Sequence, residues 1–554
     1  MDFIKSKNGL ILPLQTGHYS TERDFSLNEV DAWRSQLPLS NVGTSAKALY
    51  EFLQDLHQAP INAHDRFIIL SHLRPTLSYL CEILGKIYAE REALSEKQQL
   101  IADLVNALHF EMLTGYKLVI DAALNSLLTK RKLFISALLN AMVCCEKIIF
   151  DTYKQHRDPP HGVWYEFNTL YLLAKNKGVS QKSLSSHVEW QSRFSTLEEL
   201  YKNCLLFAIS NPYRLTKLEL THLTYALEVW APLLILKPLS ENSQGLFVID
   251  LNSDQAPHYA AFNPTPSPSS FMLVLDKITL RLEKLLQDKT STTTKKSSNY
   301  FLEAEQQLPN TFIESLLGSW QYIKERAQKR DKAKGAISVC LGISSCHWFI
   351  SDELSANSQN HEASQDFHVI DLSIDQGAQK SQSYRYYDCQ LVDQSEGGYC
   401  LQWIEEIPTQ LQCGEIIAIQ RVSPNHSKNW TIGTIRWLRH EKDHTILLGV
   451  QVLSHEVLAV YSSLEDAQSE HQTATLLLAE QPLHNKPKTL ITPSLPFKAG
   501  QEIKVAFQDH AYPAVLQKNY SLSPCYQQFG IEFLYEQPDI PIMTTKPSRA
   551  APPV

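Results

Sequence analysis

The sequence lacks the patterns that most readily identify an enzyme, a metal protein or a disulfide-rich protein. Its ten cysteines are scattered and include no C-x-x-C pair, so their spacing indicates neither a zinc site nor a disulfide framework, and reduced thiols are the simpler interpretation. The chain shows no Gly-x-x-x-x-Gly-Lys-Ser/Thr loop, no Gly-x-Ser-x-Gly elbow and no helix carrying His-Glu-x-x-His. We therefore expect a protein that is not an enzyme, with no catalytic residue, no metal site and no cofactor.

Signals for export and membrane insertion are also missing. The N-terminus, MDFIKSKNGLILPLQTG, has no basic start followed by a sustained apolar run, so we expect no signal peptide. The most apolar stretch, residues 133–150, is interrupted by Asn140, Glu146 and Lys147, whereas a membrane span needs roughly 20 predominantly apolar residues. We predict a buried helix there, and a cytoplasmic protein without membrane insertion.

Strong charge of either sign is absent as well. Hydrophobic residues make up 43% and charged residues 20% of the chain, as in ordinary soluble globular proteins. The formal net charge of −8 argues against a nucleic-acid binder, so any anion site must be a local basic cluster. Because 554 residues exceed what one hydrophobic core usually covers, we expect about two to four domains.

The first half of the chain has the periodicity of helices. Residues 1–43 are polar and irregular, and we expect only short strands or loops there. Between 44 and 287 apolar residues recur at three- and four-residue spacing. Pro75 lies inside one such stretch and should kink or break it. We predict a mainly α-helical bundle at 44–287, with a strand within 245–262 and a last helix at 271–287.

This helical half carries little recognisable chemistry. His161 and Glu166 follow Pro159-Pro160, and a ligand set could be built from them. The interpretation we favour is a helix start whose aromatic residues pack inward. We expect the helical domain to bind a protein partner whose identity the sequence does not give.

A domain boundary is predicted after the bundle. Residues 288–310 include a run of Lys, Thr and Ser without apolar residues or periodicity, which indicates a flexible linker. Thr311-Phe312-Ile313-Glu314 then has the form of a capping box at a helix start. The predicted helix ends in a basic run, and cations suit a helix C-terminus because its unpaired carbonyls are partly negative.

The remaining chain is predicted to be rich in strands. Six short segments with turn residues between them favour a small closed antiparallel barrel, and they are 337–343, 384–393, 398–403, 415–421, 430–438 and 446–452. The polar stretch 351–383 is interpreted as an insertion, which costs little chain entropy. We assign 311–465 to a barrel domain with a leading helix, 470–536 to a C-terminal β-rich domain that forms a second barrel or extends the first, and 537–554 to a disordered tail.

Two motifs in this region fit a ligand that contains both guanine and phosphate. Arg326 and Arg330 lie one helical turn apart, and the planar guanidinium matches phosphate oxygens and the O6/N7 edge of guanine. Asp393 can accept from guanine N1–H and N2–H, Ser395 adds a hydroxyl, and Gly398 lets a flat ligand approach the backbone. Arg-x-x-x-Arg followed by Asp-x-Ser-x-x-Gly resembles the signature of the PilZ domain, a bacterial receptor for cyclic di-GMP.

The resemblance implies an α+β multidomain protein in which the helical bundle precedes a PilZ-like six-stranded antiparallel β-barrel. It implies that Arg326 and Arg330 clasp the phosphates and guanine edges of cyclic di-GMP. Asp393 and Ser395 would bond the other guanine face, and Gly398 would leave room for the ring.

The same resemblance implies a cytoplasmic effector that changes conformation and partner contacts when it binds the second messenger. Two features depart from the family pattern. The separation of 63 positions between Arg330 and Asp393 is long, and Glu325 stands where the family often has a basic residue. Glu325 favours the alternative, a degenerate PilZ-type adaptor that acts through protein–protein contacts without nucleotide.

Overall fold

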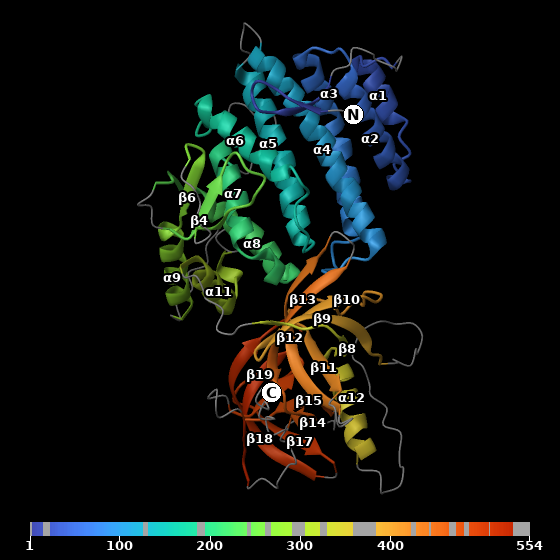
Figure 1. Ribbon diagram of the computed structural model, residues 1–554, viewed down its shortest axis with the longest axis vertical. Coiled ribbons are helices and arrows are strands. Elements are labelled where there is room, and N and C mark those ends of the chain that lie inside the picture. Colours follow the sequence, from blue (N-terminus) through green and yellow to red (C-terminus); the bar gives the residue numbers. More distant parts are fainter. Residues whose placement is uncertain are drawn as a thin grey trace, which may run out of the picture. The chain divides into compact units, whose positions relative to one another are not determined.

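The chain divides into two compact units, Met1–Arg326 and Ala327–Val554 (Figure 1). The computed structural model describes residues 3–14, 23–125, 131–184, 194–240, 245–260, 267–290, 305–321, 330–357, 384–422, 428–441, 445–464, 472–480, 487–508 and 510–535.

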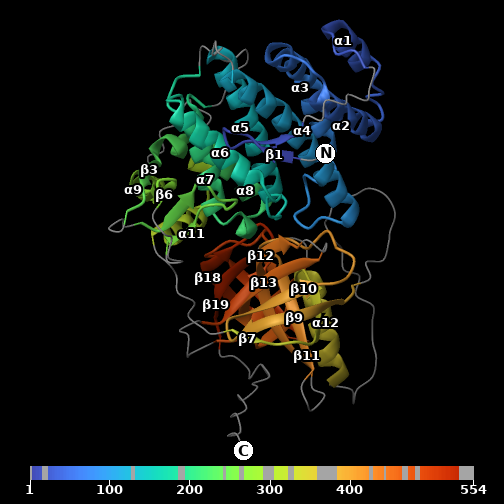
Figure 2. The same cartoon turned by 45° about the horizontal axis from the view of Figure 1, so that its top comes forward.

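The first unit is the predicted helical bundle, built around one large hydrophobic core. Polar caps set several helix starts; at α3, for example, the Asn62 side chain accepts from the amides of His64 and Asp65. Helices α4 and α5 pack side by side (Figures 1 and 2). The helices are α1 (Leu27–Ser35), α2 (Val42–Gln58), α3 (Ala63–Lys86), α4 (Glu96–Asn125), α5 (Arg131–Lys154), α6 (Val163–Asn176), α7 (Leu197–Ile209), α8 (Lys217–Trp230), α9 (Asp276–Thr290) and α11 (Asn310–Gln321).

Two local expectations in this unit differ from the structure. Helix α3 continues through Pro75, which is exposed, so the proline does not end the helix. In the segment 1–43, the short strands β1 (Phe3–Lys5) and β2 (Ile11–Pro13) pair as expected, but helix α1 was not predicted. Helix α1 is short and polar, and it is held by a few contacts such as the stacking of Trp33 on Phe52, with ring centroids 4.1 Å apart.

Helix α5 contains the apolar stretch 133–150. Among the described residues it is the one helix long and apolar enough to cross a membrane, and 78% of its most apolar window is buried inside the protein. The prediction of a buried helix is therefore confirmed.

A small antiparallel sheet follows the bundle, with the order β3-β6-β4-β5. Residues 271–274 were expected to begin a helix, but they lie in β6, and α9 begins at Asp276. The reason is that β6 is an inner strand, bonded to β3 on one side and β4 on the other, so a continuous apolar run is buried there. The strands are β3 (Ile235–Pro238), β4 (Phe247–Asp250), β5 (His258–Tyr259) and β6 (Ser270–Val274).

A domain boundary at 288–310 would place helix α11 in the barrel domain. In the structure α11 packs in the first unit instead. Its apolar stripe joins the core of the bundle, and the Trp320 indole donates to the Ile209 carbonyl at 3.2 Å. Glu305, 3% exposed, accepts from both Trp230 and Arg281 at 2.7 Å, which holds the preceding turn in the same core. The unit boundary therefore falls after α11, and residues 291–304 lie outside the described part.

The second unit begins with the predicted six-stranded antiparallel barrel. It closes in the order β8-β9-β10-β13-β12-β11, with β11 paired back to β8 and the short strand β7 added beside β9. Its strands are β7 (Asp331–Lys332), β8 (Ala336–Leu341), β9 (Tyr387–Ser395), β10 (Gly398–Trp403), β11 (Ile416–Val422), β12 (Lys428–His440) and β13 (Ile446–Ser454).

One helix in this barrel was not predicted. Gly342, with a φ of +82°, ends β8, and α12 (Ile343–Asn357) follows where the first strand was expected to continue to Ile343. Residues 358–383, most of the predicted insertion, lie outside the described part.

The C-terminal strands form a second closed barrel, with the order β14-β15-β16-β19-β18-β17. The sequence left open whether these strands extend the first barrel, and the strand missed there was β14, which pairs with both β15 and β17. Helix α12 shares a hydrophobic cluster with both barrels. The strands are β14 (Val457–Leu464), β15 (Thr473–Leu478), β16 (Thr489–Thr492), β17 (Glu502–Phe507), β18 (His510–Leu522) and β19 (Gln527–Phe533). The predicted tail, 537–554, lies outside the described residues.

Candidate functional site

The structure brings Arg330 and Asp393 together across 63 positions of sequence. Arg330 Nη1 donates to Asp393 Oδ1 at 2.8 Å, and the two side chains are 28% and 24% exposed. The backbone explains the encounter, because β7 directly follows Arg330 and pairs with the end of β9, with Lys332 opposite Asp393. Arg326 lies outside the described residues.

Strand register places Asp393 in a row of residues that crosses the outer face of the barrel. Asp393 is opposite Cys400 of β10, Cys400 is opposite Gly449 of β13, and Gly449 is opposite Trp437 of β12. The next register pair, Leu401 and Leu448, is fully buried, as expected when alternate residues point into and out of a barrel.

We call this row the floor, and it has a polar end and an aromatic end. Neighbouring strands lie about 4.8 Å apart, so Asp393 and Trp437 stand roughly 14 Å apart with two small residues, Cys400 and Gly449, between them. A side chain at Gly449 would collide with the Trp437 indole, so the ring lies against the backbone at that point.

The pKa of the Cys400 thiol depends on its burial and on the charges near it. Burial and, to a smaller extent, the charge of Asp393 raise its pKa to about 11, and Arg330 opposes that rise. The thiol is therefore protonated near neutral pH, and it adds a small neutral group to the floor.

Ser395 and Gly398 occupy the hairpin between β9 and β10. They face each other in the register, and the Ser395 hydroxyl is 3.5 Å from the Gly398 carbonyl oxygen. A Cβ on Gly398 would collide with the carbonyl oxygen of Val450 on β13. The close approach of a neighbouring strand is thus one reason for glycine here, independent of any ligand.

Trp437 and Arg439 are not part of the two sequence motifs. Both lie on β12 at the parity of the outer face, and Arg439 lies 3.7 Å from Glu441. The available signal was the alternation Trp-Leu-Arg, in which the buried Leu438 separates two outward-facing side chains that can bind a base and a phosphate.

Other combinations suggested by the sequence do not form a metal or catalytic centre in the described part of the chain. His161 is 93% exposed beside Asp254, whereas Glu166 is buried in an ion pair with Lys117 at 2.6 Å, so the two do not act together. Residues 440–444 match His-Glu-x-x-His, but His440 is the last residue of strand β12. The pattern is therefore not on a helix, where its two histidines would share one face.

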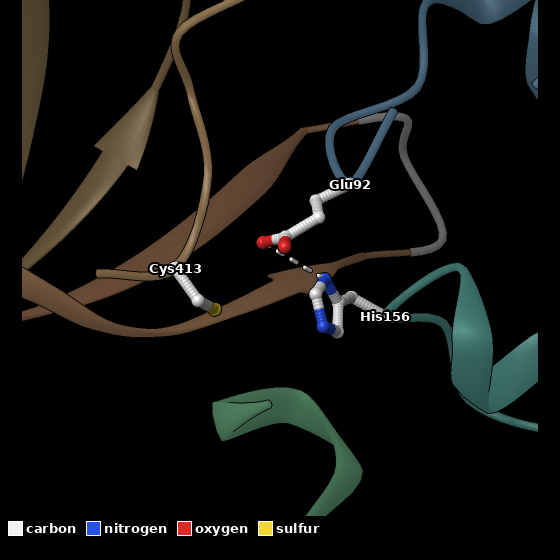
Figure 3. A group of neighbouring side chains, drawn as sticks. All are labelled: Glu92, His156 and Cys413. Carbon is white, nitrogen blue, oxygen red and sulfur yellow. Dashed lines mark ion pairs between the residues drawn. The ribbon is translucent and has the colours of Figure 1, made fainter. Parts of the chain in front are cut away.

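Glu92 and His156 form a buried acid–imidazole pair, with their atoms 3.9 Å apart (Figure 3). His156 Nε2 bonds the Leu215 carbonyl at 2.9 Å, and Glu92 accepts from the Lys217 amide at 3.1 Å. These bonds tie the end of α5 to the start of α8, which is a structural role.

Three family models match successive parts of the chain. The model of the N-terminal domain of the cyclic-di-GMP receptor FimW matches residues 28–240, that of its middle PilZ domain matches 246–369 and 355–457, and that of its C-terminal β-barrel domain matches 460–534. The chain is also 24% identical over 571 residues to the cyclic-di-GMP receptor FimW of Pseudomonas aeruginosa, covering 94% of this chain and 92% of that protein. No solved structure matches the chain.

Proposed function

Because the chain belongs to the PilZ domain proteins and carries the three domains described for FimW, we propose that it is a receptor for cyclic di-GMP. The observation that carries the proposal is the bond between Arg330 and Asp393, since it joins the two halves of the motif at one place on the barrel. The proposed role is binding, which is supported by the receptor family that the chain matches and by the donors, acceptors and aromatic ring on this face of the barrel.

Each side chain has a role that follows from its chemistry. Arg330, with Arg326, holds phosphate oxygens and the O6/N7 edge of guanine, which a guanidinium fork matches. Asp393 accepts from guanine N1–H and N2–H, and Ser395 adds a hydroxyl at the same hairpin. The bond between Arg330 and Asp393 uses one of five guanidinium donors and one of two carboxylate oxygens, so both residues can bind the nucleotide while they orient each other.

The floor of the row positions the base. Cys400 is the small residue beside Asp393, and the Trp437 indole, which lies against the Gly449 backbone, offers an aromatic face about two strand spacings from Cys400. Gly398 keeps the β10 backbone close to β13, which fixes the hairpin that carries Ser395.

The position of the arginine motif suggests how binding becomes a signal. Helix α11 ends at Gln321 within the core of the first unit, and Arg330 is held by the barrel of the second. The eight residues between them include Arg326, so a nucleotide that binds both arginines fixes the segment that joins the units. The resulting change in the surface offered to a protein partner is the proposed output.

A second function remains a competing proposal. The Arg330–Asp393 bond satisfies both charges within the protein, and Glu325 adds a carboxylate to the basic segment. Both features favour an adaptor that keeps the PilZ fold and works through protein contacts without nucleotide.

Calorimetric titration of the full chain with cyclic di-GMP separates the two functions. A receptor should release or absorb heat in a saturable manner, and the double variant Arg326→Ala/Arg330→Ala should lose it, because each charge-assisted bond contributes on the order of 1.5–3 kcal/mol. The matched control is Arg385→Ala, an ion-paired arginine two residues before β9, 4.0 Å from Glu405 and about 26 Å along the strand direction from Asp393. Lys295→Ala is a second control. No heat with the parent chain supports the adaptor.

A further inference from the structure

The first unit contains a cavity, lined in part by charged side chains, that the proposed receptor function does not use. Its volume is about 570 Å³, and it is bounded by helices α3, α4, α5 and α8. Pockets of roughly 300–1,000 Å³ accommodate small-molecule ligands.

One wall is a polar stripe on an otherwise apolar helix. Lys147, Asp151 and Lys154 of α5 all line the cavity, and their spacing of four and three residues places them on one face. The rest of this helix is mostly buried in the core, so the stripe is what gives α5 a side open to solvent.

Two aromatic side chains that line the cavity carry polar atoms. Tyr88 is 7% exposed and His109 is 8% exposed, and neither the Tyr88 hydroxyl nor the His109 ring makes a hydrogen bond to another described residue. Both groups can therefore bond to water or to a ligand that enters the cavity.

The charges inside the cavity are arranged around Asp151. Its carboxylate acts on the pKa of both His109 and Tyr88, which places it near their polar atoms. Burial lowers the pKa of His109 to about 4, so the ring is neutral near pH 7 and can both donate and accept.

Lysines from three helices gather at the rim. Lys217 is fixed by bonds to the carbonyls of Ala89 at 2.7 Å and Tyr88 at 3.3 Å, and Lys86 is bound to Glu82 at 3.0 Å. With Lys147 and Lys154 they make four ammonium groups against two carboxylates in a chain whose net charge is −8. Such a local excess of cations favours an anionic ligand.

We propose that this cavity binds a small phosphorylated compound that also carries hydroxyl or N–H donors. Lys147 and Lys154 hold the phosphate as point charges, while Asp151 accepts from the donors and Tyr88 and His109 complete their hydrogen bonding. The ligand is larger than a lone phosphate, since its hydroxyl or N–H donors must reach Asp151 while Lys147 and Lys154 hold its phosphate.

The test titrates the full chain with ribose 5-phosphate and, in parallel, with inorganic phosphate. We expect one-to-one saturable binding of the sugar phosphate with a Kd at least about fivefold below that for phosphate, because only the former reaches Asp151. Lys147→Ala/Lys154→Ala should weaken both probes by about tenfold or more. Tyr88→Phe keeps the ring packing and removes only the hydroxyl, so it should weaken the sugar phosphate and leave phosphate unchanged.

Lys132→Ala is the matched control, since Lys132 is an exposed lysine on the same helix. It should leave both titrations unchanged, as should Asp393→Asn in the other unit. Equal affinity for the two probes, an equal loss in Lys132→Ala, or no saturable binding up to about 10 mM would overturn the proposal, and the cavity would then be filled by water.

Discussion

Replacing Asp393 by asparagine gives two opposite expectations, depending on what the carboxylate does. If it reads guanine, the change removes a charged acceptor and weakens binding of cyclic di-GMP. If it only neutralises Arg330, at 2.8 Å in the structure, the change releases a guanidinium for phosphate and strengthens binding. Asparagine has nearly the same shape, so packing is preserved in both cases.

The expected sizes of the two effects decide whether the Kd for cyclic di-GMP rises or falls. A charge-assisted bond from the carboxylate to guanine contributes about 1.5–3 kcal/mol, or roughly 10- to 150-fold in Kd. The Arg330–Asp393 pair has side chains 28% and 24% exposed, and pairs this close to solvent contribute about 0.5–1 kcal/mol, or roughly two- to fivefold. The loss therefore exceeds the gain, and we expect Asp393→Asn to weaken binding by about tenfold.

Calorimetric titration of the full chain measures this change, with Arg385→Ala as the control for loss of an unrelated arginine two residues before β9. Arg330→Ala and the combined variant Arg330→Ala/Asp393→Asn complete a double-mutant cycle. The cycle should give a coupling free energy between Arg330 and Asp393, because the two residues share one bond. Unchanged or tighter binding by Asp393→Asn would refute the assignment of the carboxylate to guanine.

Three further predictions concern the same protein. Trp437→Ala should weaken cyclic di-GMP binding about 5- to 150-fold in the same titration, because stacking a base on an aromatic ring contributes about 1–3 kcal/mol, and an unchanged Kd would remove Trp437 from the site. Gly398→Ala should lower the melting temperature without ligand, since its Cβ meets the Val450 carbonyl and overpacking costs about 1–3 kcal/mol; lost binding at an unchanged melting temperature would contradict this. Burial lowers the pKa of His109 and of His347 to about 4, below the unfolded value near 6.5, so the unfolded chain binds these protons more readily. Their contribution to stability is complete above pH 6.5 and is lost as the pH falls towards 4. Melting temperatures across this window should fall less in a His109→Gln/His347→Gln variant, and an equal fall would exclude the two rings as the cause.

The barrel was predictable because half-buried strands carry their own pattern. The segment 398–403 matches β10 at both ends, and the other five strands were placed within a few residues. The meeting of Arg330 and Asp393 was predicted from the chemistry of the motif, and β7 supplies the backbone pairing that brings them together.

What failed was the choice of packing partner. The apolar stripe of α11 predicts that one face of the helix is buried, but it does not predict which hydrophobic core that face joins. In the structure Trp320 packs against Trp230 of the bundle. Strand β14 was missed because only two residues separate the end of β13 at Ser454 from the start of β14 at Val457. No long turn marks the start of a new strand there. Cys400, Gly449 and Trp437 are separated in sequence and become neighbours only through the register of three strands.

The cluster around α12 has a consequence for how this protein can evolve and be engineered. Through it the helix joins side chains of both barrels into one apolar body, with Ile343, Cys346 and Ile350 from α12, Ile416 and Ile432 from the first barrel, and Leu476 and Ile491 from the second. A gene fusion or truncation that separated the barrels would leave part of this surface facing water. The C-terminal barrel therefore cannot be exchanged for another domain without exposing this apolar surface. We expect relatives that keep the first barrel and α12 to keep the second barrel as well.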